Sequence, residues 1–541
     1  MSLAVGRDVI EKTSADAFKR ERDSVSRFSS DRDVVIQSSG MPDEALQDLM
    51  AAAKAVSDSK TVRAIESVLL ARQGNFSVPI PNFKALEGVL RAFFKHNLIE
   101  GWIYVEGEDG QLYPELITEI SYEESRRGND APPTVTIKTV YYGRSSDGRN
   151  GGTLMRVERG GHTFLPTDVA RRRVADVLAK KGLYKETAEL KQNYEDVMRR
   201  HGEVTLNAFS KQFRACGRVN YYETGHYQNR NVTVTNRRVI HDLEASNYAA
   251  MENHVDSVLM DGAAGSDGMG QVPEHPVVRV FDLKSHDFYW MHSSTLEPYK
   301  YDKTLGDKLV LPESHRDLLD VLTTDIECFV SDIIEGKSAG NVILCKGIPG
   351  VGKTLTAEVY AELIEKPLYC IHSGTLGTKA QEIEKSLERV FKRAKRWDCT
   401  LLLDEADVFV VQRGGNIEQN AIVAEFLRTL EYFDGLLFLT TNRPSDIDEA
   451  IISRCAAIIG YEVPQGDAVA KVWKVMAEQY KAELPDQLVA ELLRIFPKIA
   501  PRDIKMLLRL ALRVSTTRKE PLTVETFRRC AMFRAVEMAP A

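Results

Sequence analysis

The chain has 541 residues, of which 43% are hydrophobic and 28% charged, and its formal net charge is −7. These proportions are those of an ordinary globular protein with room for roughly three or four domains, and they give no sign of a nucleic-acid partner. No apolar run approaches the ~18 residues that span a bilayer, and the first residues lack the apolar stretch of a signal peptide. The seven cysteines stand singly, which argues against a disulfide framework or a zinc site. We therefore expect a cytoplasmic protein without a membrane partner.

The N-terminal residues predict helices followed by strands. Residues 1–75 are expected to be helical, because apolar residues recur there at helical spacing. These residues are Val62, Ile65, Val68 and Leu69. A second amphipathic helix is indicated by Leu86, Leu90, Phe93 and Phe94. The runs "GWIYVEG" and "TVTIKTVYYG" are typical of strands.

The segment before the nucleotide-binding motifs continues this mixed pattern. A charged helical stretch is expected from about Thr167 to His201, and the Gly-, Ser- and Asp-rich segment 260–276 is expected to be a flexible loop or linker. More strands follow in "PVVRVFDLKSHDFYWMH", whose aromatic residues we assign to a core rather than to a ligand cage. From Arg156 to Arg238 there are 17 Lys and Arg against 9 Asp and Glu. We favour a solvated surface for this basic stretch over a nucleic-acid site.

A glycine-rich loop after a short apolar strand is the most specific motif in the chain. The sequence "GIPGVGKT" follows the strand Asn341–Lys346, matches GxxxxGK[ST] and opens a helix that should end by Pro367. Backbone N–H groups of such a loop converge on phosphates at the positive end of the helix. Lys353 would reach the outer phosphates, and Thr354 would ligate Mg²⁺. The expected nucleotide-binding residues are Gly347, Ile348, Pro349, Gly350, Val351, Gly352, Lys353, Thr354 and Leu355.

The tetrapeptide Asp404-Glu405-Ala406-Asp407 raises the alternative of a DEAD-box helicase. It follows the buried strand Thr400–Leu403, so Asp404 can hold Mg²⁺ and Glu405 can polarise the water that attacks the γ-phosphate. A helicase needs these acids too, and the residues downstream decide. The next strand ends at Thr441-Asn442, where the Asn442 amide can orient the lytic water. Arg454 follows on a short helix, a position suited to reaching a neighbouring subunit's nucleotide.

Farther on, "IAPRDIKMLLRLALR" places Arg502 at the start of a helix with an apolar face of Ile504, Leu507, Leu508 and Ala511. Together these motifs resemble the AAA family of AAA+ ATPases, over about residues 308–541, and in particular single-module members with a long N-terminal region. The resemblance implies sensor roles for Asn442 and Arg502, an arginine finger at Arg454, ATP hydrolysis with Mg²⁺, and assembly into a hexameric or similar ring. It displaces the helicase alternative.

Two positions depart from that family pattern. The place of an aromatic pore loop holds Ala380-Gln381-Glu382, so threading of a polypeptide is not expected. The place of a second arginine after the finger holds Ala457, so Arg454 would act alone or with Arg443.

The predicted fold is α/β, a P-loop NTPase parallel sheet with a C-terminal helical lid, preceded by an α+β region. The expected divisions are a helical segment 1–75, an α+β recognition region 76–307, a nucleotide-binding domain 308–465 and a helical lid 466–541. The expected function is ATP hydrolysis coupled to remodelling of a protein client bound through the N-terminal region. A nucleic-acid motor or loader and a nucleotide-gated scaffold stay open as alternatives.

Overall fold

The computed structural model describes the chain in stretches separated by gaps. These stretches are residues 2–27, 34–37, 41–59, 61–62, 65, 69, 76–77, 79–80, 83, 86–124, 132–146, 153–169, 171–206, 210–223, 232–242, 253–261, 267–324, 341–377, 379–415, 417–534 and 536–539. None of the helices in these stretches combines the length and the apolar character needed to cross a membrane.

The N-terminal residues combine three helices with a two-stranded ribbon. In chain order the elements are β1 (Ser2–Val5), α1 (Arg7–Glu11), η1 (Asp16–Phe18), α2 (Lys19–Arg27), β2 (Val34–Gln37) and α3 (Asp43–Ala55). β1 and β2 pair antiparallel. Within the described residues of the expected helical segment 1–75, the ribbon departs from that expectation, because its short strands are stabilised by a pairing that local periodicity does not reveal. Val68 lies outside the described residues.

A five-stranded antiparallel sheet in the order β6-β5-β4-β3-β7 follows. The elements of this part are α5 (Leu86–Lys95), β3 (Trp102–Glu106), β4 (Leu112–Glu123), β5 (Thr134–Ser146), β6 (Thr153–Phe164), α6 (Pro166–Val169), α7 (Val174–Lys180), β7 (Leu183–Lys185) and α8 (Ala188–Leu206). The predicted apolar face of α5 is buried. The charged stretch 167–201 is not one helix, because β7 interrupts it and pairs with β3 at Tyr184 and Tyr104.

A six-stranded antiparallel sheet in the order β15-β8-β10-β13-β14-β9 comes next along the chain. The elements are β8 (Gln212–Arg218), β9 (Tyr221–Tyr222), β10 (Thr233–His241), β11 (His254–Asp256), β12 (Met269–Gln271), β13 (Val277–Asp282), β14 (Phe288–His292), η4 (Ser293–Thr295) and β15 (Leu296–Pro298). Tyr289 and Trp290 are buried, which confirms that these aromatic residues belong to a core. The expected loop 260–276 contains β12, which pairs with β11.

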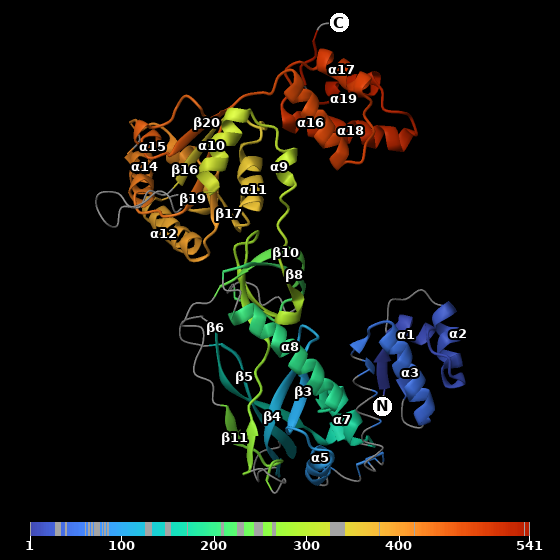
Figure 1. The fold of residues 1–541 in the computed structure, drawn as a ribbon. Coiled ribbons are helices and arrows are strands. Elements are labelled where there is room, and N and C mark those ends of the chain that lie inside the picture. The colour runs from blue at the N-terminus through green and yellow to red at the C-terminus, as the bar shows by residue number, and fades with distance from the viewer. Residues whose placement is uncertain are drawn as a thin grey trace.

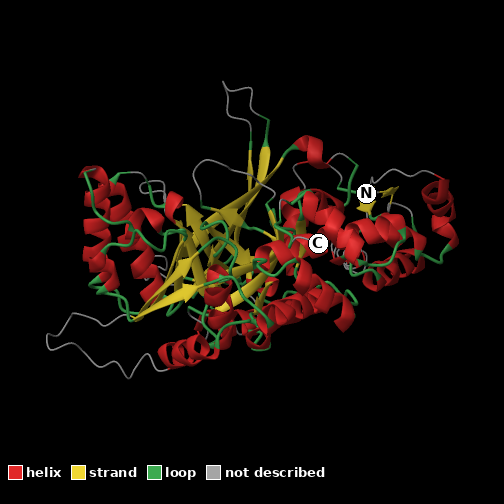
Figure 2. Ribbon diagram, turned by 90° about the horizontal axis from the view of Figure 1, so that it is seen from above, coloured by secondary structure: helices red, strands yellow, loops and turns green. Residues whose placement is uncertain are grey.

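The C-terminal part begins with a five-stranded parallel sheet in the order β17-β18-β19-β16-β20. Its elements, with the flanking helices, are α9 (Leu305–Lys308), α10 (Glu313–Thr324), β16 (Asn341–Gly347), α11 (Lys353–Leu363), β17 (Leu368–His372), η6 (Ser373–Thr375), α12 (Ala380–Arg396), β18 (Thr400–Asp404), α13 (Asp407–Val410), α14 (Ile417–Leu430), β19 (Leu436–Thr441), α15 (Glu449–Ile452) and β20 (Ala457–Tyr461). The predicted α/β class with a parallel sheet is confirmed. Figure 2 shows helices on both sides of the strands.

Four helices complete the chain. They are α16 (Asp467–Gln479), α17 (Asp486–Ile495), α18 (Pro501–Arg518) and α19 (Val524–Met532). They pack around their own core, in which Trp473 and Phe527 meet edge to face with ring centroids 5.5 Å apart. The predicted apolar face of α18 is buried in this core, and Figure 1 shows the four helices as a separate bundle beside the α/β sheet.

The six-stranded sheet joins the N-terminal part to the α/β part. In Figure 1, β8 and β10 lie directly below the α/β helices. Phe281 of β13 belongs to the core of the α/β part, with ring centroids 5.6 Å from Tyr369 and 4.8 Å from Trp397. Aromatic pairs of this kind each contribute about 0.5–1.5 kcal/mol beyond the area they bury. The N-terminal part therefore meets the α/β part through a packed joint.

Candidate functional site

Three neighbouring strands of the parallel sheet end at the same edge. The order β18-β19-β16 brings the ends of these strands together at Asp404, Thr441 and Gly347. Sheets of this class bind ligands at the carboxyl ends of the strands, where the strand order reverses. Here the reversal lies at β16, whose neighbours β19 and β20 come from later in the chain.

The loop after β16 depends on glycine at two close contacts. A Cβ on Gly347 would lie 2.3 Å from the carbonyl oxygen of Tyr461, and its φ of +153° is rare for other residues. Gly350 has a φ of +85°, and a Cβ there would lie 2.8 Å from Cβ of Arg502. The loop can therefore approach both β20 and α18 closely, while its backbone leads into the N-terminus of α11.

Lys353 lies at the start of α11 with only 6% of its surface exposed. Its Nζ donates to the carbonyl oxygens of Gly347 (2.8 Å) and Ile348 (2.7 Å) and to Oδ1 of Asn442 (2.8 Å). Burial lowers the pKa of Lys353, while Asp404 and Asp407 act in the opposite direction. All three donors of the ammonium are used on neutral oxygens. An anionic phosphate oxygen would be a stronger acceptor for this buried charge.

Asp404 forms a polar cluster with two hydroxyl groups. Its Oδ1 accepts from Thr354 Oγ1 at 2.8 Å and from Thr440 Oγ1 at 2.7 Å. A carboxylate and a hydroxyl side by side are oxygen ligands of the kind that Mg²⁺ prefers, with the rest of its octahedron filled by phosphate and water. The described part of the chain has no group of three His, Cys, Asp or Glu residues that could hold a metal ion by itself. The residues present fit a magnesium ion shared with a phosphate ligand.

Glu405 projects outward from the end of β18. Its φ of +54° is in the left-handed region, and its backbone N–H donates to Thr440 Oγ1 at 2.9 Å. A non-glycine residue in this region is strained by about 1–2 kcal/mol, so the Thr440 bond helps to hold the turn. The Glu405 side chain is exposed and can act on a molecule in front of the strand ends.

The turn after β19 is fixed by the last residue of the Asp404–Asp407 tetrapeptide. Asp407 Oδ1 accepts from the Thr441 hydroxyl and, at 3.0 Å, from the backbone N–H of Asn442. This turn directs the Asn442 amide toward Lys353. The positioning roles of Asp407 and Thr440 were not predicted from the sequence. The paired threonines before Asn442 were the available signal.

Arg454 lies on the outside of the α/β part. It is exposed, and its Nη1 donates to the carbonyl oxygen of Ala450 at 3.1 Å. The short helix α15 before it is capped by Asp448, which accepts from the Ala450 N–H at 2.9 Å. Arg413 donates to both carboxylate oxygens of Asp448, at 2.8 and 3.3 Å. Arg454 thus follows a braced turn, and its side chain is open to solvent.

Arg502 connects the helical bundle to the glycine-rich loop. Its backbone N–H donates to the carbonyl oxygen of Gly350 at 3.1 Å, while its side chain is exposed. Among the remaining predicted positions, Pro349 on the loop and Leu355 on α11 are exposed, whereas Val351 is buried. Ala457 is buried on β20. Ala380–Glu382, expected in a loop, instead form the first turn of α12.

These features define a P-loop ATPase domain of the AAA type. Residues 343–463 match the family model "ATPase family associated with various cellular activities (AAA)", and the chain carries an AAA+ ATPase domain.

The sequence is similar to fidgetin-like protein 1 of Drosophila melanogaster, with 24% identity over 314 residues, 56% of this chain and 56% of that protein. It is also similar to the ATPase family gene 2 protein homolog B of Rattus norvegicus, with 33% identity over 120 residues, 20% of this chain and 16% of that protein. The chain thus spans about half of the first relative and a smaller part of the second. Among solved structures, the FIGL-1 AAA domain aligns with 17% identity and a TM-score of 0.37, covering 44% of this chain and 86% of that one.

Proposed function

We propose that this protein hydrolyses ATP between adjacent subunits of a ring and uses the energy to remodel a protein client. The observation that carries the proposal is the convergence of Lys353, Thr354, Asp404, Glu405 and Asn442 at one edge of the parallel sheet. On this proposal the protein is cytoplasmic. Residues 1–307 form the recognition region, residues 308–465 the nucleotide-binding domain and residues 466–541 the lid.

The roles follow from the contacts of each side chain. Lys353 exchanges its neutral acceptors for β- and γ-phosphate oxygens and neutralises their charge. Backbone N–H groups of the loop 347–355 bind the phosphates at the N-terminus of α11. Glu405 accepts a proton from the attacking water, and Asn442 orients that water. Magnesium, held by Thr354 and Asp404, would neutralise charge on the phosphate oxygens.

Arg454 is proposed to act on the nucleotide of the neighbouring subunit. An arginine finger of this kind stabilises the charge that spreads over the transferred phosphoryl group. The exposure of Arg454 and the bracing of its turn by Asp448 and Arg413 support this role, since the side chain is presented outward in a fixed direction. A ring assembly is the arrangement that would complete every site in this way.

The joint between the parts supports movement of the N-terminal region with the nucleotide site. Helix α11 begins at Lys353 and carries Glu362 near its other end. Buried Glu362 accepts from Tyr299 Oη at 2.7 Å and from the backbone N–H of Asp302 at 3.0 Å, and pairs with Arg238 at 3.0 Å. A shift of α11 on nucleotide turnover would reach the six-stranded sheet directly. The first turn of α12, with Ala380–Glu382, has no aromatic residue to grip a threaded chain.

The basic stretch 156–238 gives little support to a nucleic-acid motor. Lys180 and Lys181 both pair with Asp168 at 3.2 Å, and buried Lys185 donates to the carbonyl oxygen of Phe93 at 2.5 Å. These three of the 17 cations in the stretch thus have partners within the chain. A nucleotide-gated scaffold differs from the proposal in two ways: a client would leave its turnover unchanged, and its assembly would follow ATP binding alone.

Two substitutions test the proposed site. Lys353→Ala should abolish ATP binding, because it removes the charge that faces the outer phosphates. Glu405→Gln should retain binding and stop hydrolysis, because an amide cannot take the proton of water. Affinity is measured with a fluorescent ATP analogue and turnover by phosphate release. Hydrolysis at the parent rate by Glu405→Gln would refute the assignment of the base.

A further inference from the structure

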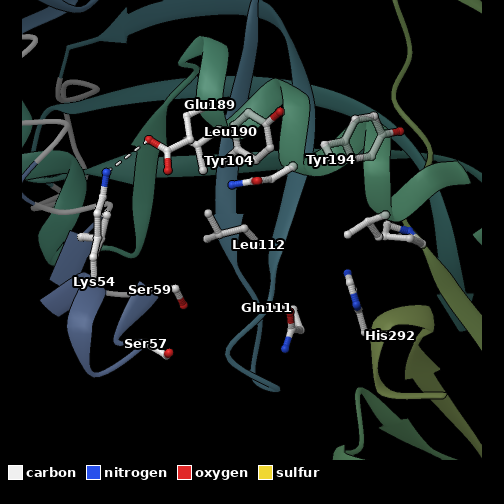
Figure 3. Close-up of a pocket in the computed structure, with 14 residues that line it drawn as sticks. Lys54, Ser57, Ser59, Tyr104, Gln111, Leu112, Glu189, Leu190, Tyr194 and His292 are labelled. Carbon is white, nitrogen blue, oxygen red and sulfur yellow. Dashed lines mark ion pairs between the residues drawn. The ribbon is translucent and has the colours of Figure 1, made fainter. Parts of the chain in front are cut away.

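A cavity of about 430 Å³ lies in the N-terminal region, among elements that take no part in the nucleotide site. Four segments that are distant in the sequence surround it: the end of α3 with the turn after it, the β3–β4 hairpin, α8, and the residues at Pro276 and His292 (Figure 3). Its volume lies in the range of about 300–1,000 Å³ that is usual for ligand sites. Its walls are assembled only when the region folds.

Most of the wall is apolar. Leu112 comes from β4, Leu190 and Val197 from α8, Pro276 from the segment before β13, and the Tyr104 ring from β3. Figure 3 shows Leu112, Leu190 and Tyr104 on the same side of the cavity. A surface of this kind stabilises an apolar side chain that leaves water, by about 25 cal/mol per Å² buried.

His292 supplies a hydrogen-bond donor at this wall. Only 3% of its surface is exposed, and its Nδ1 lies 2.6 Å from Ser294 Oγ and 3.3 Å from the Ser294 backbone nitrogen. Burial lowers the pKa of His292 to about 4, so the ring is neutral at pH 7. In the tautomer in which Nδ1 accepts from the Ser294 hydroxyl and backbone N–H, the neutral ring carries its proton on Nε2. Nε2 has no hydrogen-bond partner among the described residues, and Figure 3 shows the ring directed toward the cavity.

Two side-chain amides add further donors and acceptors. Gln111 of the β3–β4 turn and Asn193 of α8 line the cavity, and neither amide has a hydrogen bond to another described residue. An amide can donate to a peptide carbonyl and accept from a peptide N–H at once. Gln111, Asn193 and His292 thus present the groups that recognise a peptide backbone.

The lining is electrically balanced. Among the described residues that line the cavity, the ionised side chains are those of Lys54 and Glu189, which pair with each other at 3.8 Å and are about half exposed, at 49% and 52%. Among these described residues, a phosphate or carboxylate ligand would meet no unmatched cation, and a cationic ligand would meet no unmatched anion. The charge pattern suits an uncharged ligand.

We propose that this cavity binds a short, extended and uncharged peptide segment of the protein client, with a large aliphatic or aromatic side chain inserted against Leu112, Leu190 and Val197. Gln111, Asn193 and the Nε2–H of His292 pair with its backbone. The inference rests on the proposed function, for which it names the recognition site and the chemistry of the segment recognised.

The test selects short random peptides displayed on phage against the full-length protein. The recovered peptides should be uncharged and should share a large apolar residue. One of them, labelled with fluorescein, is then titrated with each protein variant in the absence of nucleotide, and fluorescence polarisation reports the affinity. Recovery of no peptide, or of peptides rich in acidic or basic residues, would overturn the proposal.

Two variants locate the binding. Val197→Trp fills the cavity from α8 and should weaken the selected peptide at least tenfold, whereas Gln192→Trp adds the same bulk at an exposed position outside the cavity and should not. Gln111→Glu serves as the second test in case Val197→Trp disturbs folding. It keeps the side-chain shape but removes a donor and adds a charge, and it should weaken peptide binding several-fold. Parent-like affinity in both Val197→Trp and Gln111→Glu would overturn the assignment. Because nucleotide is absent, a protein that binds the peptide here yet hydrolyses no ATP contradicts the proposed function alone.

Discussion

Thr440→Val is the substitution that isolates the positioning of the catalytic acids. Thr440 is 2% exposed at the end of β19, and its hydroxyl donates to Asp404 Oδ1 at 2.7 Å and accepts from the Glu405 N–H at 2.9 Å. Valine has nearly the same shape, so the packing of the sheet should persist while both bonds disappear. A hydrogen bond to a charged group contributes about 1.5–3 kcal/mol.

The strain at Glu405 raises the importance of that bond. Its φ of +54° is held partly by the donation to Thr440, so the valine variant should let the Glu405 turn relax away from the attacking water. A loss of ~1.5–3 kcal/mol in the transition state corresponds to a fall in kcat of ~10–150-fold. ATP affinity should change little, since Lys353 and Thr354 keep their contacts.

The assay is steady-state phosphate release combined with nucleotide binding, for Thr440→Val and for the matched control Thr440→Ser. The serine keeps the hydroxyl and should retain most of the parent turnover. If Thr440→Val hydrolyses ATP as fast as the parent, the hydroxyl does not position Glu405. A fall in affinity as large as the fall in kcat would point instead to a collapsed site.

Two further outcomes follow from the joint and from the buried histidines. Glu362→Gln should accelerate hydrogen exchange of the Asp302 amide about tenfold or more, because it weakens the acceptor of that N–H and the ion pair with Arg238. Unchanged exchange at Asp302 would contradict a joint held by Glu362. Burial lowers the pKa of His241, His275 and His292 to about 4 each. Below about pH 6.5 the unfolded chain therefore binds protons that the folded chain does not. The free energy of unfolding should fall from pH 6.5 toward pH 4, by up to ~3 kcal/mol for each histidine. A melting temperature that stays constant over this interval would refute the burial of these histidines as neutral rings.

The α/β part was predictable because its signals are local. The loop 347–354, the buried strand before Asp404 and the strand ending at Thr441 are each continuous in the sequence, and parallel strands flanked by helices follow from their alternation. The apolar faces of α5 and α18 were predictable for the same reason, since helical spacing is visible within a few turns.

The strands that were not predicted from the sequence are short and pair with strands elsewhere in the chain. β7 has three residues between two charged helices, and its pairing with β3 decides its conformation. β12 lies in a glycine-rich segment and is extended because it pairs with β11. Such pairings lower the free energy of a segment whose own residues give little strand signal.

The candidate site likewise combines residues that local motifs predict with residues whose roles depend on contacts distant in the sequence. The residues with predicted roles come from motifs, whereas Thr440, Asp407 and Asp448 act through side-chain hydrogen bonds between segments that are far apart in the sequence. The contact of the Arg502 backbone with Gly350 likewise arises only when α18 packs against the loop.

Mixing two inactive variants tests whether ATP is hydrolysed at a boundary shared by two subunits. Arg454→Ala alone should retain ATP affinity and lose turnover by about 10³-fold, as removal of an arginine finger does. When Arg454→Ala subunits are co-assembled with Glu405→Gln subunits, some boundaries contain an intact Glu405 facing an intact Arg454. We expect phosphate release to recover in the mixture to a measurable fraction of the parent rate. Confirmed co-assembly with no recovered turnover at any mixing ratio would contradict it.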